Sequence, residues 1–303
     1  MTARIPIKLR QLQYFLAAAK TLHFSQAAEE LFVTQPTLSH QIAELETHLG
    51  TPLFDRTSKA VRLTQAGEVL LAYAKRGLGE LEAGIGALEE LEGLQRGLLR
   101  IGVTQSFVRK LMPPILGQFM KLYPSVRLSV DEMTAGEIEN CLAQGELDLG
   151  IAFAPALLED TEIETILQER LLLVTGSTHR FAARRRVRMN ELSDEPLALF
   201  SKEYSTRHLL ERYFKEAGIE PNVVCSANAI DVMLGIAKES SVATIIPESA
   251  IEKNPDIRVI ELIDPIPVRI SAVLWAKHRF RSAAARTFAQ LVRDRFLSKL
   301  VLR

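Results

Sequence analysis

Apolar residues in the stretch 24–49 recur with the spacing of a helix that buries one side. Leu38, Ile42, Leu45 and Leu49 follow one another at steps of four, three and four residues, which places them on one stripe of an α-helix. A shorter segment with alanine and leucine precedes this helix, and polar residues separate the two. The pattern predicts two short helices joined by a tight turn.

The ends of these two predicted helices carry residue types that commonly begin a helix. Ser25 is expected to cap the first helix and Thr34 the second. Pro36 fits the first turn of the second helix, where its missing N–H breaks no hydrogen bond. That helix then begins with a polar surface suited to the major groove of DNA, formed by Gln35, Thr37, Ser39, His40 and Gln41.

Two flanking segments complete a small N-terminal domain. Residues 8–20 predict a third helix, whose apolar side is made by Leu9, Leu12, Leu16 and Ala19, with Phe15 beside them. Residues 53–63 combine short apolar pieces with a polar tip and predict a two-stranded wing. The wing carries Arg56, Lys59 and Arg62, which are suited to phosphates or to the minor groove. A solvated hairpin with incidental charges is the alternative, and the position directly after a recognition-like helix favours DNA.

A long helical pattern runs from Thr64 to about Leu94, with acidic residues on the faces that its apolar seam leaves free. Such a narrow seam favours pairing with the same helix of a second chain. A helix packed on its own domain is the alternative, and four glycines, at 77, 79, 84 and 86, argue against a rigid coiled coil. The seam consists of Leu78, Leu81, Ile85, Leu88, Leu91 and Leu94.

The remainder of the chain alternates between strand and helix patterns, which predicts parallel sheets in an α/β domain. Two such halves would form a cleft, the usual place for a small ligand. The last strand and the closing helix are expected to return to the first half. Strands are predicted at 98–103, 126–130, 147–153, 171–176, 197–200, 223–226, 242–246 and 271–275, and helices at 110–123, 135–142, 206–217, 230–238 and 283–297.

Composition narrows the function classes. Thirty-seven basic and 37 acidic residues cancel, so a DNA-binding argument must be local. The sequence shows no signal-peptide pattern and no apolar run long enough for a membrane span, so we expect a cytoplasmic protein. Cys141 and Cys225 are expected to be buried thiols. Scattered histidines and the lack of catalytic motifs predict no enzyme, no cofactor and no metal site.

The run of arginines at 184–186 with Arg188 admits two interpretations. A second DNA contact is one of them. A solvated loop is favoured, because no aromatic or glycine pattern accompanies the charges.

With these residues laid out, the whole chain resembles LysR-type transcriptional regulators. The later half matches more loosely, at 145–151, and the segments 151–155 and 226–228 are most similar to regulators of the cyanate-operon type. The residues at 239–242 depart from a glycine pair that relatives often have, and His40 stands where many relatives carry arginine or another polar residue. The ordered N-terminal matches lie at 9–15, 24–28, 34–39, 45–46, 49–50, 52–56 and 63–67.

The resemblance implies a winged helix-turn-helix at 1–65, a dimerising linker helix at 66–95 and a periplasmic-binding-protein-like effector domain at 96–303. The effector domain would have lobe I at about 96–165 and 268–303, and lobe II at about 166–267. DNA contacts are expected at Ser25, Gln26, Thr34, Gln35, Thr37, Ser39, His40, Arg56, Lys59 and Arg62. Effector contacts are expected at Thr104, Gln105, Ser106, Thr134, Ser201, Thr206 and Asn228.

We therefore expect a regulator whose binding to promoter DNA is controlled by a small polar or anionic effector between two α/β lobes. Residues 104–107 follow a strand and precede a helix, so their hydroxyl and N–H groups could hold an anion, although a simple helix cap is the alternative. The resemblance also implies a homodimer or homotetramer, with RNA polymerase as a further candidate partner. A solute-binding receptor without a DNA role is the other class, and the N-terminal helix-turn-helix discriminates against it.

Overall fold

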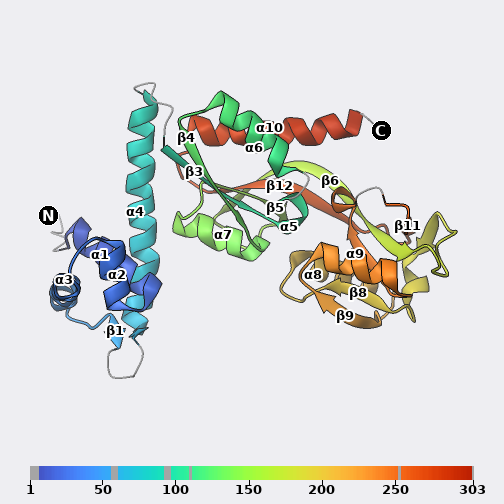
Figure 1. The fold of residues 1–303 in the computed structure, drawn as a ribbon, viewed down its shortest axis with the longest axis horizontal. Helices are drawn as coiled ribbons and strands as arrows, with labels where there is room; N and C mark the ends of the chain where they lie inside the picture. Colours follow the sequence, from blue (N-terminus) through green and yellow to red (C-terminus); the bar gives the residue numbers. More distant parts are fainter. Residues whose placement is uncertain (1–6, 56–60, 92–96, 109–110, 252–253, 302–303) are drawn as a thin grey trace. The chain divides into compact units, whose positions relative to one another are not determined.

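The structure is a computed structural model that describes residues 7–55, 61–91, 97–108, 111–251 and 254–301 (Figure 1). The chain divides into two compact units, residues 1–82 with 144–146, and residues 83–143 with 147–303, which we describe one at a time. Among the helices that the structure describes, none is long and apolar enough to cross a membrane.

Three helices form the core of the N-terminal unit: α1 (Leu9–Thr21), α2 (Phe24–Glu30) and α3 (Gln35–Leu49). The predicted stripe of α3 is confirmed at three positions, because Leu38, Ile42 and Leu45 are fully buried, whereas Leu49 is only partly covered. These side chains meet the alanines of α2 and the aromatic residues of α1. Small residues on α2 let the neighbouring helices approach closely.

The buried side of α1 agrees only in part with the predicted one. Phe15 and Ala19 are buried as predicted, Leu12 and Leu16 are partly covered, and Leu9 is half exposed. Tyr14 and Ala18 face the core instead. Leucines and aromatic residues occupy both sides of this helix, so its periodicity alone is ambiguous. Phe15 packs edge-on against Phe54, with ring centroids 5.6 Å apart. This contact with a residue far along the chain helps to fix the orientation of α1.

The two predicted helix caps have different outcomes. Thr34 is the N-cap of α3, and its hydroxyl oxygen accepts a hydrogen bond from the Thr37 N–H at 3.4 Å, so this prediction is confirmed. Ser25 does not cap α2. His23 does, because its Nδ1 accepts the Gln26 N–H at 3.3 Å and the helix begins one residue before Ser25.

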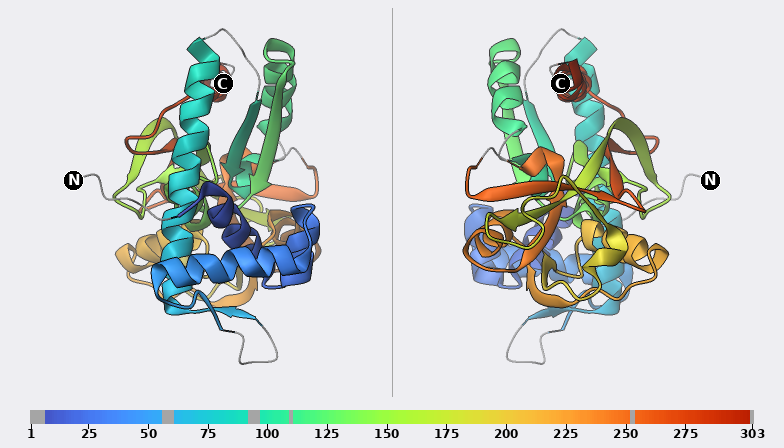
Figure 2. Two further views of the ribbon diagram at one scale, coloured as in Figure 1. Left: turned by 90° about the vertical axis from the view of Figure 1, so that its left-hand side faces the viewer. Right: turned by 90° about the vertical axis from the view of Figure 1, so that its right-hand side faces the viewer.

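The predicted wing is present as two short antiparallel strands, β1 (Phe54–Asp55) and β2 (Arg62–Leu63), seen at the foot of Figure 2. The Glu46 carboxylate on α3 accepts hydrogen bonds from the backbone N–H groups of Leu53 and Phe54, at 2.7 and 3.2 Å. These bonds fix the start of the wing against the end of α3. Arg56 and Lys59 lie outside the described residues.

The long helix α4 (Gln65–Leu91) follows the wing. Its predicted seam is open to solvent at Leu81, Ile85 and Leu88, each more than half exposed, and Leu78 is partly covered. The side chain of Leu91 is not described, and Leu94 lies outside the described residues. Leu81, Ile85 and Leu88 therefore do not serve the core of their own chain, whereas Ala66, Leu70 and Leu71 at the start of α4 pack against the N-terminal core.

The C-terminal unit contains a mixed sheet in the order β4-β3-β5-β12-β6-β10-β8-β9, with β11 pairing β6 and β7 pairing β11. Every predicted strand has a counterpart, but the prediction of parallel sheets is wrong in part, since β6 and β12 run antiparallel to their partners. The strands are β3 (Gly97–Val103), β4 (Val126–Glu132), β5 (Leu149–Ala154), β6 (Thr161–Gly176), β7 (Arg186–Arg188), β8 (Leu197–Phe200), β9 (Val223–Ala227), β10 (Ala243–Pro247), β11 (Ile257–Ile263) and β12 (Val268–Ala276).

Helices cover both faces of each half of this sheet (Figure 1). In the first half, α6 (Met112–Leu122) and α10 (Ala283–Val301) share a core with β3 and β5, and α7 (Ala135–Gln144) packs on the opposite face. In the second half, α8 (Ser205–Glu216) and α9 (Ile230–Glu239) contribute to separate cores. Three short helices complete the domain: α5 (Gln105–Val108), η1 (Met189–Leu192) and η2 (Glu248–Ala250).

Strand β6 is the element that joins the two halves, and the sequence pattern predicted only its second part. Its residues 161–170 pair with β12, while residues 171–176 pair with β10 and β11. A single strand therefore belongs to both lobes.

The arginine run is exposed to solvent and partly paired with acidic residues. Arg184 pairs with Glu191 at 2.5 Å, and Arg186 pairs with Glu261 at 2.9 Å. The hydrogen bonds from Arg184 hold the pKa of Glu191 below its usual value. All four arginines are exposed, in agreement with the favoured interpretation of a solvated segment, although Arg186 and Arg188 lie on the short strand β7 rather than in a loop.

The packing of α4 against the wing can be tested by a substitution at Gly67. A Cβ on Gly67 would overlap the Leu53 carbonyl oxygen and lie 2.9 Å from Leu63 Cδ2, so Gly67→Ala should lower the free energy of unfolding by about 1–3 kcal/mol. Gly86→Ala is the matched control, because a Cβ there meets nothing within 4 Å, and it should be neutral or stabilise by up to about 1 kcal/mol. Thermal unfolding followed by circular dichroism measures both. Equal melting temperatures for the two variants would contradict this account.

Candidate DNA-reading surface and inter-lobe site

The start of α3 presents an ordered set of polar groups. The hydroxyl groups of Thr34 and Thr37 lie 2.8 Å apart, and Gln35 Nε2 donates a hydrogen bond to Ser39 Oγ at 3.2 Å. Gln35, Thr37 and His40 are exposed, while Ser39 is half-buried. Because Gln35 and Ser39 orient one another, an exposed amide is held ready to exchange hydrogen bonds with a base edge.

The other predicted DNA contacts lie in the same unit. Ser25 and Gln26 are exposed in the first turn of α2, where backbone N–H groups favour a phosphate. Arg62 is exposed on β2, in register with Asp55 on β1. The described part of the wing thus offers one cation for a phosphate contact.

A buried ion pair lies where the two lobes meet. Arg269 on β12 and Glu169 on β6 are direct neighbours in the strand register, and both side chains are almost completely buried. Glu169 Oε1 accepts hydrogen bonds from Arg269 Nε at 2.8 Å and from Ser271 Oγ at 3.2 Å. Burial lowers the pKa of Arg269, and the charge of Glu169 opposes this effect.

Arg269 also connects two of the predicted effector residues across the lobes. Its Nη2 donates to Ser106 Oγ on α5 at 3.0 Å, and its Nη1 donates to Thr206 Oγ1 on α8 at 3.2 Å. The guanidinium lies 3.7 Å from the centroid of the Phe153 ring, a cation–π contact that partly replaces the lost hydration. The structure therefore brings Ser106 and Thr206 together around one cation.

Gln105 makes a second link between the lobes. Its side-chain carbonyl accepts the Ile230 N–H at the start of α9, at 3.2 Å, and its amide donates to Glu132 at 3.2 Å. The N-cap residue of α9 is Ala229, whose side chain has no polar group. The side-chain oxygen of Gln105 therefore accepts an N–H group at the start of a helix in the opposite lobe.

The remaining predicted effector residues are used in local structure. Thr104 is buried, and its N–H and hydroxyl both point to the Ile151 carbonyl, at 3.0 and 3.5 Å. The Ser201 N–H donates to the Ala227 carbonyl at 3.0 Å, so Ser201 lies close to the exposed Asn228. Among the residues that the structure describes, no side-chain hydrogen bond joins Thr104, Ser201 or Asn228 to Arg269.

Thr134 serves as a helix cap. Its N–H and hydroxyl both donate to Glu137 Oε2 at 2.8 Å, and these bonds hold the pKa of Glu137 below its usual value. The Thr134 hydroxyl is therefore already engaged at the start of α7, where it also accepts the Glu137 N–H at 3.3 Å.

Acidic groups surround this region. The pKa of Tyr204 is raised, first by burial and then by the negative charges of Glu203, Glu132 and Glu137. Glu132 and Glu137 come from the first lobe, whereas Tyr204 and Glu203 come from the second.

The sequence analysis missed Arg269, Glu169 and Ser271. The available signal was Arg269, the one charged residue of the apolar stretch 268–276, which stands among Val268, Ile270 and Ala272. A charge in such a place requires a partner. One hundred residues separate the two charges, so the sequence alone does not show that they pair.

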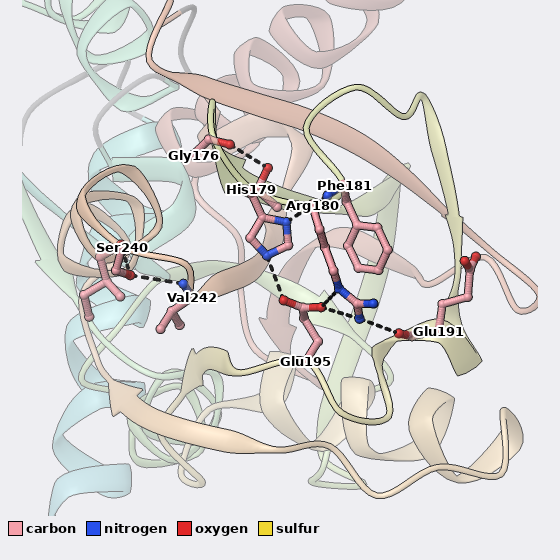
Figure 3. A network of polar contacts seen from close by, with 10 residues as sticks. Gly176, His179, Arg180, Phe181, Glu191, Glu195, Ser240 and Val242 are labelled. Carbon is pink, nitrogen blue, oxygen red and sulfur yellow. Dashed lines mark hydrogen bonds and ion pairs between the residues drawn. The ribbon is translucent and has the colours of Figure 1, made fainter.

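A separate polar network stabilises lobe II (Figure 3). His179 Nε2 contacts Glu195 Oε1 at 2.7 Å, and Arg180 Nε donates to Glu195 Oε2 at 2.5 Å. His179 Nδ1 accepts the Phe181 N–H at 3.1 Å, so Nε2 must carry the proton that is shared with Glu195. This arrangement ties the loop after β6 to the segment before β8.

The side chain of Ser240 stabilises the turn at 239–242. Ser240 Oγ donates to the Ile236 carbonyl at 2.6 Å and accepts the Val242 N–H at 3.1 Å (Figure 3). A serine hydroxyl thus makes the turn between α9 and β10 without a glycine pair.

Two family models match the chain. Residues 9–68 match the bacterial regulatory helix-turn-helix protein model of the lysR family, and residues 92–297 match the LysR substrate binding domain. Among curated proteins, the chain is 32% identical to the HTH-type transcriptional regulator AlsR of Bacillus subtilis over 80% of this chain and 82% of that protein. It is also 32% identical to the uncharacterized HTH-type transcriptional regulator YnfL of Escherichia coli, over 93% of this chain and 96% of that protein.

Solved structures support the same fold. A full-length OxyR variant from Pseudomonas aeruginosa aligns over 95% of both chains with a TM-score of 0.77 at 24% identity. Full-length CbnR complexed with its target DNA aligns over 95% of this chain and all of that one, with a TM-score of 0.68 at 24% identity. The N-terminal helix-turn-helix and the two-lobed α/β domain are thus both shared with these structures.

The ion pair between the lobes can be tested by stability. Arg269→Met should lower the free energy of unfolding by about 3–5 kcal/mol, because it leaves Glu169 buried without its partner. The double variant Arg269→Met/Glu169→Met removes both charges and should recover part of that loss. Urea unfolding can be followed through Trp275, the single tryptophan, which is buried on β12. A single variant as stable as the parent would refute the role of the pair.

Proposed function

The chain belongs to the LysR family of DNA-binding transcriptional regulators, whose members carry a ligand-binding effector domain, and from this membership we propose how its own residues act. Regulators of this family bind promoter DNA and small-molecule effectors and form oligomers. The observation that carries the DNA-reading role is the start of α3, whose polar side chains are exposed and orient one another.

The start of α3 reads the operator. Gln35 and Ser39 are held together at 3.2 Å, which lowers the entropy lost when Gln35 contacts a base. Thr37 and the exposed His40 extend the same polar surface, and His40 contributes to the choice of base. Ser25, Gln26 and Thr34 serve phosphates, because they lie at helix N-termini.

The wing supplies cations to the DNA backbone. Arg62 is the described member of this set, and Arg56 and Lys59 are assigned to it from the sequence alone. Their role is electrostatic, so it should appear in the salt dependence of binding rather than in base preference.

The exposed side of α4 pairs with a second copy of the chain. Val69 and Tyr73 extend the open apolar positions of this helix toward its start. They also line a groove of about 520 Å³, whose other walls include Leu49, Leu53 and Leu70. Apolar groups from a second chain would bury this surface, and two linked winged domains would then read two related half-sites. A homotetramer is the larger assembly that we propose, with DNA bending between its two dimers.

The effector acts where the lobes meet. Ser106, Thr206 and Gln105 are its proposed contacts, with Thr104, Thr134, Ser201 and Asn228 at the periphery. A ligand that binds one relative angle of the lobes better than another would shift the population toward that angle. We infer a small polar or anionic effector, no catalytic reaction, and a place of action in the bacterial cytoplasm. The cyanate-operon subgroup is supported only by the amino-acid sequence of residues 151–155 and 226–228.

The reading surface can be tested by base discrimination. Gln35→Ala or Ser39→Ala should reduce the preference for the operator over a mismatched duplex by about 1–3 kcal/mol if either residue makes a good base contact. The duplex is a promoter fragment that the purified parent protein protects. Gln118→Ala, at an exposed position on α6, is the control. Unchanged preference in a gel-shift titration for both variants would sink the assignment.

The wing can be tested by salt. Arg62→Ala should make the log–log slope of DNA affinity against salt shallower by about 0.9, the value for one phosphate contact. Arg127→Ala, at an exposed position on β4, controls for a general loss of charge. Identical slopes for Arg62→Ala and the parent would remove Arg62 from the DNA contacts.

A further inference from the structure

The sheet is narrowest where the chain passes from one lobe to the other. β12 pairs with β5 from residue 270 onward, and β6 pairs with β10 and β11 only after residue 170. Between these limits the described part of the sheet consists of β6 and β12 alone, paired at Val268–Arg170 and Arg269–Glu169. We call these two residue pairs the crossover. Because a two-stranded ladder twists more readily than a wider sheet, a change of angle between the lobes is concentrated there.

One hydroxyl group of lobe II binds both backbone groups of Val268 in the crossover. Tyr213 Oη accepts a hydrogen bond from the Val268 N–H at 3.2 Å and donates one to the Val268 carbonyl at 3.3 Å. A tyrosine hydroxyl can make both bonds at once, because it carries one proton and also accepts. Tyr213 belongs to α8 and packs against the core of lobe II. Its hydroxyl therefore attaches the crossover to a helix of that lobe.

Tyr213 occupies the side of β12 that β5 leaves open. The Pro267 carbonyl accepts the Leu171 N–H at 2.8 Å and so points toward β6. The backbone groups of the next residue, Val268, therefore point away from β6. Two residues later, at Ile270, the same side of β12 pairs with β5. The tyrosine hydroxyl thus makes the two hydrogen bonds that one further residue of β5 would make.

A second side chain of α8 reaches the same crossover. Thr206 Oγ1 accepts a hydrogen bond from Arg269 Nη1 at 3.2 Å. Thr206 and Tyr213 are separated by about two helical turns, which places them on one face of α8. Leu210 and Phe214 are buried in the lobe II core, so this helix is anchored to its own lobe. α8 therefore binds both β12 residues of the crossover.

The two attachments respond differently to a ligand. Thr206 is a proposed effector contact, and an effector that takes its hydroxyl group weakens the bond to Arg269. Tyr213 is not among the proposed contacts. We propose that Tyr213 is a positioning residue of the ligand response: its hydroxyl keeps the crossover attached to α8 while an effector occupies Thr206, so that movement of α8 changes the twist of the crossover and the angle of lobe I. This inference rests on the proposed function, which places the effector between the lobes and DNA bending between the dimers.

Hydrogen exchange of the free, full-length protein tests the attachment. Tyr213→Phe keeps the ring and removes the hydroxyl, so the Val268 N–H loses its acceptor and should exchange about two- to tenfold faster, the range of one lost hydrogen bond. Peptides from α8 should exchange as in the parent. Tyr123→Phe is the matched control, because the Tyr123 hydroxyl contacts Thr287 at 2.9 Å in lobe I, and its loss should leave exchange at residue 268 unchanged.

A double variant tests whether Tyr213 takes over when Thr206 is lost. Thr206→Val removes the hydroxyl that Arg269 binds, as an effector would. If Tyr213 then holds the crossover, Thr206→Val/Tyr213→Phe should accelerate exchange at Val268 by more than the product of the two single effects, whereas independent sites act additively in free energy.

DNA bending gives a readout that a loss of stability alone does not move. The fragment is a promoter segment that the parent protein protects, saturated with full-length regulator, and its bend angle is measured from the gel mobility of circularly permuted fragments. The double variant should change this angle most, Tyr213→Phe should change it less, and Tyr123→Phe should match the parent.

Each contrary result has a separate meaning. Unchanged exchange at Val268 in Tyr213→Phe would remove the attachment, and faster exchange throughout lobe II would reduce the hydroxyl to a contribution to stability. Single effects that simply multiply in the double variant, or a bend angle that no variant changes, would remove the positioning role. A parent protein that binds the promoter without bending it contradicts the proposed assembly instead, and the exchange measurements, made without DNA, still decide the role of Tyr213.

Discussion

The effector domain depends on one buried ion pair. Arg269 on β12 and Glu169 on β6 face each other in the strand register, and the desolvation of both charges is offset only while the pair and its hydroxyl partners stay together. The same guanidinium holds Ser106 from one lobe and Thr206 from the other. A single buried cation thus links the two lobes at the proposed effector site, beside the second link that Gln105 makes.

Local rules predicted the parts of the chain that local forces determine. The Thr34 cap, the buried stripe of α3 and the order of strands and helices follow from neighbours within a few residues. Ser25 was predicted as a cap because its residue type is favoured, but the ring nitrogen of His23 occupies that role two residues earlier. A cap depends on which of two nearby acceptors reaches the N–H group, and residue type alone does not decide between them.

Distant contacts set the rest. The buried side of α1 follows from aromatic packing with the wing, and the two charges at 169 and 269 meet only after the whole domain has folded. The same limit applies to the site: sequence reasoning found Ser106 and Thr206 as polar residues near strand ends, yet it missed the arginine that joins them. It also assigned Thr134 to the effector, whereas the described contacts of its hydroxyl serve the start of α7.

The continuity of β6 has a mechanical consequence for signalling. One strand passes through both lobes, and it exchanges its pairing with β12 for pairing with β10 and β11 between residues 170 and 171, so the lobes can rotate about this junction while both ladders stay intact. The easiest relative motion is a change of strand twist, a soft deformation of a sheet. A ligand that favours one relative rotation of the lobes would therefore change the twist of β6, and the twist would return to its original value when the ligand leaves.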